Sequence, residues 1–113
     1  MHELSIMTHL LEGVEKEAHR RGARGIRRID LVIGERLGVV HESLLFCFDV
    51  LSAGTLAEGA RLEVRRVPMR FACAEHGEYG RQDDDFGCPI CGRVGALTEQ
   101  GSELLVESME IER

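Results

Sequence analysis

The chain has 113 residues, 43% of them apolar and 30% charged, and a formal net charge of −6. This size fits one modest hydrophobic core plus a small segment held together by a metal ion, and it excludes two ordinary domains. The composition excludes a wholly disordered chain. No apolar run approaches the roughly 20 residues that span a bilayer and no signal-peptide pattern opens the chain, so we expect a cytoplasmic protein, while the acidic balance disfavours a general nucleic-acid binder.

The first predicted element is an amphipathic helix that starts near Leu4. Apolar side chains recur there at the three- and four-residue intervals of one helical face, namely Leu4, Met7, Leu11, Val14 and Ala18. Gly22 is expected to end the helix. A basic stretch overlaps the helix end and is interpreted as a solvated helix end and turn; it comprises His19, Arg20, Arg21, Arg24, Arg27 and Arg28.

The rest of the chain predicts strands and a second helix. Alternating apolar and polar residues indicate strands at 28–33, 61–65 and 104–111, and an apolar stripe indicates a helix at 40–51. Cys47 lies in that stripe and is expected to be a core side chain. This order predicts an α+β fold, in which two helices pack on a small sheet of about three strands and a zinc-ribbon-like module is inserted at residues 71–97.

The insertion carries four metal-ligand side chains in two closely spaced pairs. Cys73 and His76 form the first pair, Cys88 and Cys91 the second, and a glycine follows each pair. Zinc favours four tetrahedral sulfur and nitrogen ligands, and a two-residue spacer lets one turn present two of them to one ion. The spacing therefore predicts a structural zinc site, whose binding energy is mostly folding energy.

Other readings of these cysteines are weaker. A thiol–disulfide pair at Cys88 and Cys91 lacks the strand-to-helix setting of redox motifs. A rubredoxin-like iron centre requires four thiolates, and His76 argues against it. No serine, histidine and acid constellation or glycine-rich phosphate loop is present, so we do not expect an enzyme.

The N-terminus offers a second, different metal site. The terminal amine of Met1, the main-chain nitrogen of His2 and the His2 imidazole are able to close fused chelate rings around one ion, and Glu3 supplies an oxygen or its own main-chain nitrogen. Nitrogen donors of this kind suit square-planar or tetragonal Ni(II) and Cu(II). A histidine at position two is weak evidence by itself.

Several segments, in the same order along the chain, resemble the HypA/HybF family of hydrogenase maturation nickel proteins. They are Met1–Met7, Ile33-Gly34-Glu35, Pro68, Cys88-Pro-Ile-Cys91-Gly92 and Ser108–Glu112. The similarity covers essentially the whole chain. One departure is His76, which stands where the family usually has the second cysteine of the first pair, so zinc ligation is expected to be Cys3His and more acid-labile.

The resemblance implies a metallochaperone that binds Ni(II) at Met1, His2 and Glu3. It implies a nickel domain of residues 1–70 plus 98–113 and a zinc-binding domain of residues 71–97. The expected partners are a HypB-type GTPase, the large subunit of [NiFe] hydrogenase and, as in some relatives, urease and its accessory proteins, with no membrane or nucleic acid. The alternative function is a zinc-ribbon module that binds a protein or nucleic acid through the Arg20 to Arg28 stretch.

Overall fold

The computed structural model describes residues 3–113, so Met1 and His2 of the predicted nickel site lie outside the described residues. The chain divides into two compact units. The first comprises the residues up to Val32 together with Gly38–Arg65 and Leu105–Arg113, and the second comprises Ile33–Leu37 and Arg66–Leu104.

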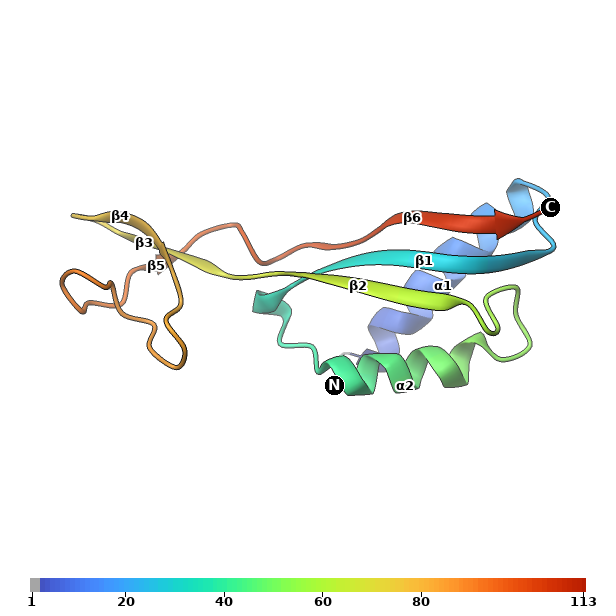
Figure 1. Cartoon of the computed structure of the whole chain (residues 1–113), viewed down its shortest axis with the longest axis horizontal. Helices are drawn as coiled ribbons and strands as arrows, with labels where there is room; N and C mark the ends of the chain where they lie inside the picture. The colour runs from blue at the N-terminus through green and yellow to red at the C-terminus, as the bar shows by residue number, and fades with distance from the viewer. Residues whose placement is uncertain (1–2) are drawn as a thin grey trace. The chain divides into compact units, whose positions relative to one another are not determined.

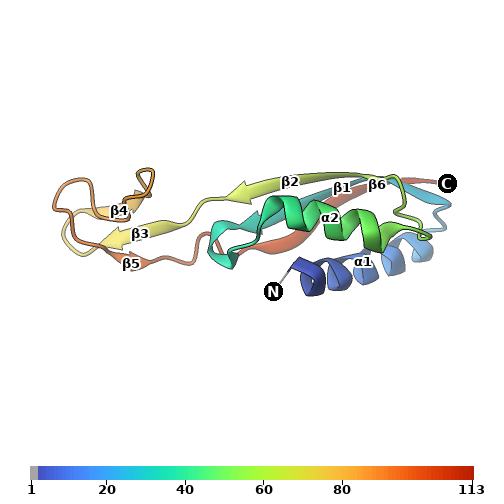
Figure 2. The ribbon, with the colours of Figure 1, turned by 90° about the horizontal axis from the view of Figure 1, so that it is seen from below.

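The first unit packs two helices on a sheet. The helices are α1 (Glu3–Arg20) and α2 (His41–Ser52), and the strands are β1 (Gly25–Gly34), β2 (Arg61–Val67) and β6 (Leu104–Glu112). The strand order is β2-β1-β6. Figures 1 and 2 show both helices on the same face of this sheet. The predicted arrangement of two helices on a three-stranded sheet is therefore confirmed.

The core of this unit lies between the helices and the sheet. Helix α1 buries residues at three- and four-residue intervals, which are Met7, Leu11, Val14 and Ala18. They meet apolar side chains of β1 and α2, among them Ile29, Leu31, Leu44 and Phe48. Removing apolar surface from water contributes about 25 cal/mol of free energy per Å². The burial of these side chains therefore stabilises the packing of the helices on the sheet. None of the described helices is long and apolar enough to cross a membrane.

Cys47 is not the core side chain that the sequence predicted. The buried side chains of α2 are Leu44, Phe48 and Ser52, which lie one turn apart, whereas Cys47 is only half-buried. Each residue advances about 100° around a helix, so Cys47 lies beside the buried stripe rather than in it. It lines a surface groove with Glu3, Leu4 and other residues of the two helices.

The second unit is built on a smaller antiparallel sheet. Its strands are β3 (Arg70–Cys73), β4 (Gly77–Gly80) and β5 (Ala96–Leu97), in the order β4-β3-β5. A 3-10 turn, η1 (Glu35–Leu37), belongs to the same unit. The small core contains two aromatic rings and two of the predicted metal ligands, with Met69 packed against it: Phe71, Tyr79, Cys73 and Cys88. The sequence did not predict these short strands.

Candidate metal centre

The four predicted zinc ligands converge in the second unit. The Sγ atoms of Cys73, Cys88 and Cys91 and a ring nitrogen of His76 lie within 4.8 Å of one another. Individual separations are 3.5 Å from Cys73 Sγ to His76 Nδ1, 3.6 Å from Cys88 Sγ to the same nitrogen and 3.8 Å from Cys73 Sγ to Cys91 Sγ.

These separations match the edges of a zinc tetrahedron. With Zn–S bonds of about 2.3 Å and Zn–N bonds of about 2.0 Å, tetrahedral angles place two sulfurs about 3.8 Å apart and a sulfur and a nitrogen about 3.5 Å apart. Disulfide sulfurs would have to approach to about 2.05 Å, which the 3.8 Å pair does not. The four side chains therefore fit a zinc-sized ion, with three sulfur atoms and the His76 nitrogen as its possible donors.

Two tight turns present the ligands. Cys73 ends β3 and pairs across the hairpin with Gly77, so His76 sits in the connecting turn. In the second turn the Gly92 N–H donates to the Cys88 carbonyl (2.8 Å) and the Ile90 N–H to the Cys88 sulfur (3.4 Å). Gly77 and Gly92 have φ of 84° and 79°, a region that favours glycine. This explains the glycine after each ligand pair.

The environment prepares two of the thiols for deprotonation. The main-chain N–H of Glu75 is the largest influence that lowers the pKa of Cys73, and the N–H of Cys91 does the same for Cys88. The N–H of Arg93 also acts to lower the pKa of Cys91, but burial and the two neighbouring thiols outweigh it and raise that pKa. A metal ion, which binds thiolates, relieves this repulsion between sulfurs.

Tyr79 stabilises the segments that flank the second ligand pair, a role that the sequence did not predict. Its ring is buried and stacks on Phe71, with centroids 5.4 Å apart. Its hydroxyl donates to the Phe86 carbonyl (2.7 Å) and accepts from the Gly95 N–H (2.8 Å). One side chain thus ties together the segments on either side of the Cys88–Cys91 turn. A lone tyrosine three residues after His76 carries no spacing signal that would have revealed this.

Of the predicted nickel-site residues, only Glu3 lies in the described part of the chain. Its Oε2 accepts the main-chain N–H of Val40 at 2.9 Å, which ties the start of α1 to the residue before α2. Glu3 also lines a groove of about 350 Å³ whose wall includes Glu42 and Cys47. The structure therefore places a carboxylate, a second carboxylate and a thiol around one opening beside the third residue of the chain.

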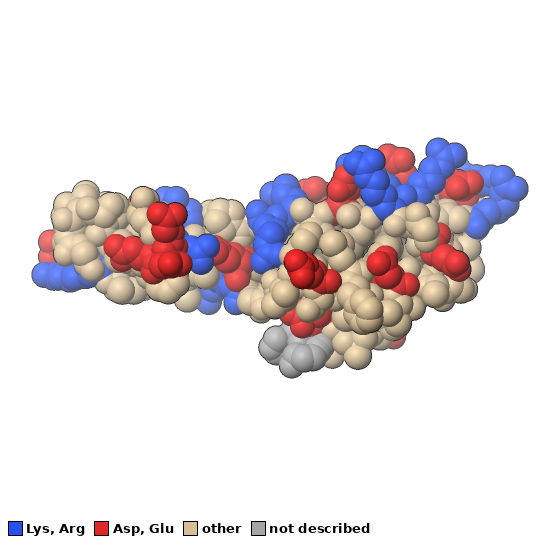
Figure 3. All heavy atoms as spheres, turned by 60° about the horizontal axis from the view of Figure 1, so that its bottom comes forward, with Lys and Arg blue, Asp and Glu red and all other residues tan. Residues whose placement is uncertain are grey.

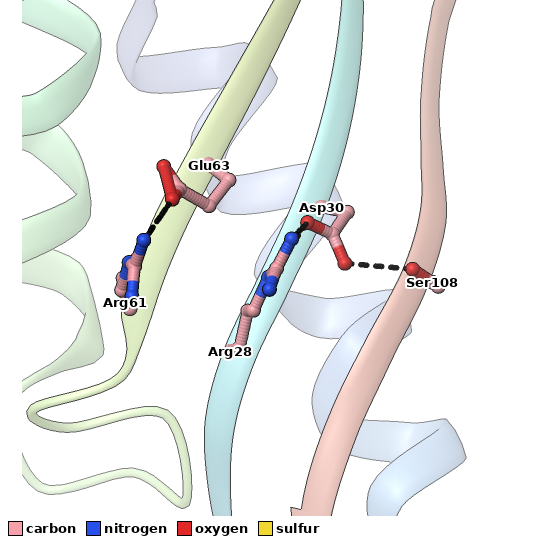
Figure 4. A network of polar contacts seen from close by, with 5 residues as sticks. All are labelled: Arg28, Asp30, Arg61, Glu63 and Ser108. Carbon is pink, nitrogen blue, oxygen red and sulfur yellow. Dashed lines mark hydrogen bonds and ion pairs between the residues drawn. The ribbon is translucent and has the colours of Figure 1, made fainter.

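The basic stretch is solvated and paired with acidic residues. Arg20 and Arg21 both contact Glu17 and lower the pKa of that carboxyl to about 2. On the face of the sheet drawn in Figure 4, Arg28 and Ser108 both reach the carboxylate of Asp30. Figure 3 likewise shows acidic and basic side chains interspersed on one face of the molecule. Arg20, Arg21 and Arg28 therefore each have a carboxylate partner.

Comparison with known proteins agrees with this geometry. The family model described as "Hydrogenase/urease nickel incorporation, metallochaperone, hypA" matches residues 1–111. A hydrogenase maturation factor HypA of Geobacter sulfurreducens is 43% identical, with 99% of this chain and all of that protein covered. Another, from Dehalococcoides mccartyi, is 42% identical over 99% of this chain and 95% of its own length.

The fold is also found among solved structures. The solution structure of the nickel metallochaperone HypA from Helicobacter pylori superimposes with a TM-score of 0.64 at 22% identity, and the match covers 99% of this chain and 98% of that one. At this level of identity the likeness concerns the fold alone. The α+β architecture is therefore one that a solved protein also adopts.

Proposed function

The chain belongs to the HypA family of nickel-incorporation metallochaperones, and from this premise we propose that it binds Ni(II) and delivers it for the maturation of [NiFe] hydrogenase. The observation that carries the proposal is the family match over residues 1–111, which includes the N-terminal Met1-His2-Glu3. A protein of this family hands over a metal rather than catalysing a reaction, so no nucleophile or general base is required.

The N-terminal donors suit the proposed cargo. The Met1 amine, the His2 main-chain nitrogen and the His2 imidazole supply three nitrogens, which Ni(II) accepts in a square-planar arrangement. The Glu3 carboxylate is already bonded to the Val40 N–H. We propose that Glu3 supplies the fourth donor, either an oxygen or its main-chain nitrogen; the nitrogen lies next to that of His2 and would take the place of the Met1 amine in the square plane.

Calorimetry of untagged, zinc-loaded protein tests the proposal. We expect one equivalent of Ni(II) to bind, and His2→Ala to abolish this binding. His9→Ala is the matched control, since His9 is an exposed histidine of α1. Binding that survives in His2→Ala, or that is lost equally in His9→Ala, would contradict an N-terminal nickel site. Glu3→Gln keeps both the main-chain nitrogen and an acceptor for Val40, so binding close to native assigns the nitrogen and weakened binding assigns the carboxylate oxygen.

We further propose that Cys73, His76, Cys88 and Cys91 hold a structural Zn(II). The support is the agreement between the 3.5–3.8 Å ligand separations and a zinc tetrahedron. We propose that nickel binds in the domain of residues 1–70 with 98–113 and zinc in the domain of residues 71–97, which lies within the second unit. Metal analysis of the purified protein is expected to find one zinc ion per chain. Its removal by a chelator should unfold the second unit, seen as loss of dispersion of that unit's amide NMR signals.

Release of the ion requires partners. A carrier gives up its metal only if a second protein binds the ion, or the carrier's metal-free state, differentially. The proposed partners are a HypB-type GTPase and the large subunit of [NiFe] hydrogenase, with urease accessory proteins as further recipients. Transfer is measured by loading the protein with nickel and following the metal to a purified partner. If the His2→Ala variant still transfers nickel fully, the metal does not pass through the N-terminal site.

A further inference from the structure

The second unit contains a cavity of about 540 Å³ that takes no part in the metal centre. Its charged lining consists of three arginines and one glutamate: Arg66, Arg70, Arg81 and Glu35. The remaining lining residues are uncharged. The wall of this cavity therefore carries three positive charges against one negative charge, in a chain whose net charge is −6.

The register of the small sheet places two of the lining arginines at neighbouring positions along the cavity wall. Arg70 opens β3 and lies directly opposite Gly80, the last residue of β4. Its Nη1 is 3.6 Å from the position that a Cβ on Gly80 would occupy, so the side chain extends across the end of β4. Arg81 follows Gly80 in the chain. Arg70 also contacts Glu78, through Nε at 3.6 Å, which orients the group without covering its Nη1 end.

Glu35 holds the Arg81 guanidinium in position. Its Oε2 pairs with Arg81 Nη2 at 2.7 Å and its Oε1 accepts the Met69 N–H at 2.8 Å. The Arg81 guanidinium also lies 5.9 Å from the centroid of the Phe86 ring. A guanidinium has five N–H donors, so one carboxylate oxygen does not exhaust its capacity. The Arg81 side chain is thus oriented by Glu35, and its guanidinium has further N–H groups that can donate hydrogen bonds to a ligand.

We propose that this cavity is an oxyanion site that binds a phosphate or a carboxylate group. Arginine presents a planar fork of donors that matches two oxygens of either group, and a fork held in place loses less entropy on binding. Three guanidinium groups around one opening disfavour a metal cation and favour an anion. The site goes beyond the proposed nickel and zinc functions, because none of its lining residues is a proposed metal ligand.

The test is an amide and arginine Nε NMR titration of the zinc-loaded protein at constant ionic strength. One arm uses inorganic phosphate and the other uses succinate. We expect saturable shifts at Met69, Arg70 and Arg81. Arg70→Gln and Arg81→Gln should each weaken binding about fivefold, the value of one partly exposed ionic contact. The matched control is Arg93→Gln, because Arg93 pairs with Glu75 in the same unit and does not line the cavity.

The two arms distinguish the ligand. Saturation by phosphate alone assigns a phosphate site, saturation by succinate alone assigns a carboxylate site, and saturation by both supports the shared chemistry. Absence of saturation in both arms, or equal weakening in Arg93→Gln, would overturn the proposal. Arg70→Lys keeps the charge but loses the fork and should bind with intermediate affinity. Zinc content and a dispersed spectrum establish that each variant is folded, independently of nickel binding.

Discussion

The hydroxyl of Tyr79 offers a sharp test of how the candidate metal centre is supported. Tyr79→Phe removes one oxygen and leaves the ring stacked on Phe71. Two hydrogen bonds are lost, one to the Phe86 carbonyl at 2.7 Å and one from the Gly95 N–H at 2.8 Å. The third contact, to the Arg93 carbonyl at 3.5 Å, is too long to count.

Each of the two bonds contributes about 1 kcal/mol, so the expected loss is about 2 kcal/mol, and more if the orphaned groups stay dry. Because the free energy of binding a structural metal includes that of ordering its site, zinc affinity should fall about 30-fold, at 1.4 kcal/mol per factor of ten.

Competition with a chromophoric chelator at fixed pH measures this change. Ser102→Ala is the matched control, since its hydroxyl bonds the Glu99 carbonyl at an exposed position of the same unit. We expect that variant to bind zinc within about twofold of native, as surface substitutions usually shift stability by no more than about 0.5 kcal/mol. If Tyr79→Phe also binds zinc within twofold of native, the hydroxyl does not support the site and the reasoning is refuted.

Three further predictions concern the ligand set, the sheet and the core. His76→Cys should retain zinc to lower pH than the native chain, because a fourth sulfur ligand binds zinc more tightly than an imidazole does; coincident release curves would contradict this. Ser108→Ala should raise the pKa of Asp30, since the Ser108 hydroxyl is the largest influence that lowers it. In the native chain this contact stabilises the fold at pH values above the usual aspartate pKa, and its stabilisation is lost as the pH falls through the lowered pKa of Asp30. An NMR titration of the Asp30 carboxyl measures the change in its pKa. Leu44→Ala should cost about 2–5 kcal/mol in urea unfolding, because Leu44 is fully buried; a loss below 1 kcal/mol would show that the site collapses around the cavity.

Local patterns predicted much of this structure. The spacing of the ligand pairs depends only on two short turns, so sequence alone identified Cys73, His76, Cys88 and Cys91 as a group. Helix α1 and strand β6 are long enough for their periods to be unambiguous. The strands β3, β4 and β5 have only two to four residues each, too few for an alternation to stand out.

Features that depend on distant residues were not predictable in this way. Glu35 acts through Met69 and Arg81, far along the chain, and no local pattern connects them. The prediction that Cys47 is a core side chain is wrong because residues that are apolar neighbours in sequence need not be neighbours in space. On α2 the buried stripe is only one residue wide per turn, through Leu44 and Phe48. The flanking position faces a groove instead.

The discontinuous make-up of the second unit limits how its metal module can be exchanged between relatives. Residues 33–37 belong to it together with 66–104, and Glu35 bonds the Met69 amide while the Gly34 Cα approaches Gly101 too closely to allow a Cβ. A chimera that transplants 66–104 alone would set foreign residues against a resident glycine and glutamate. A graft therefore keeps these contacts only if it carries both segments or meets a glycine and a glutamate at positions 34 and 35.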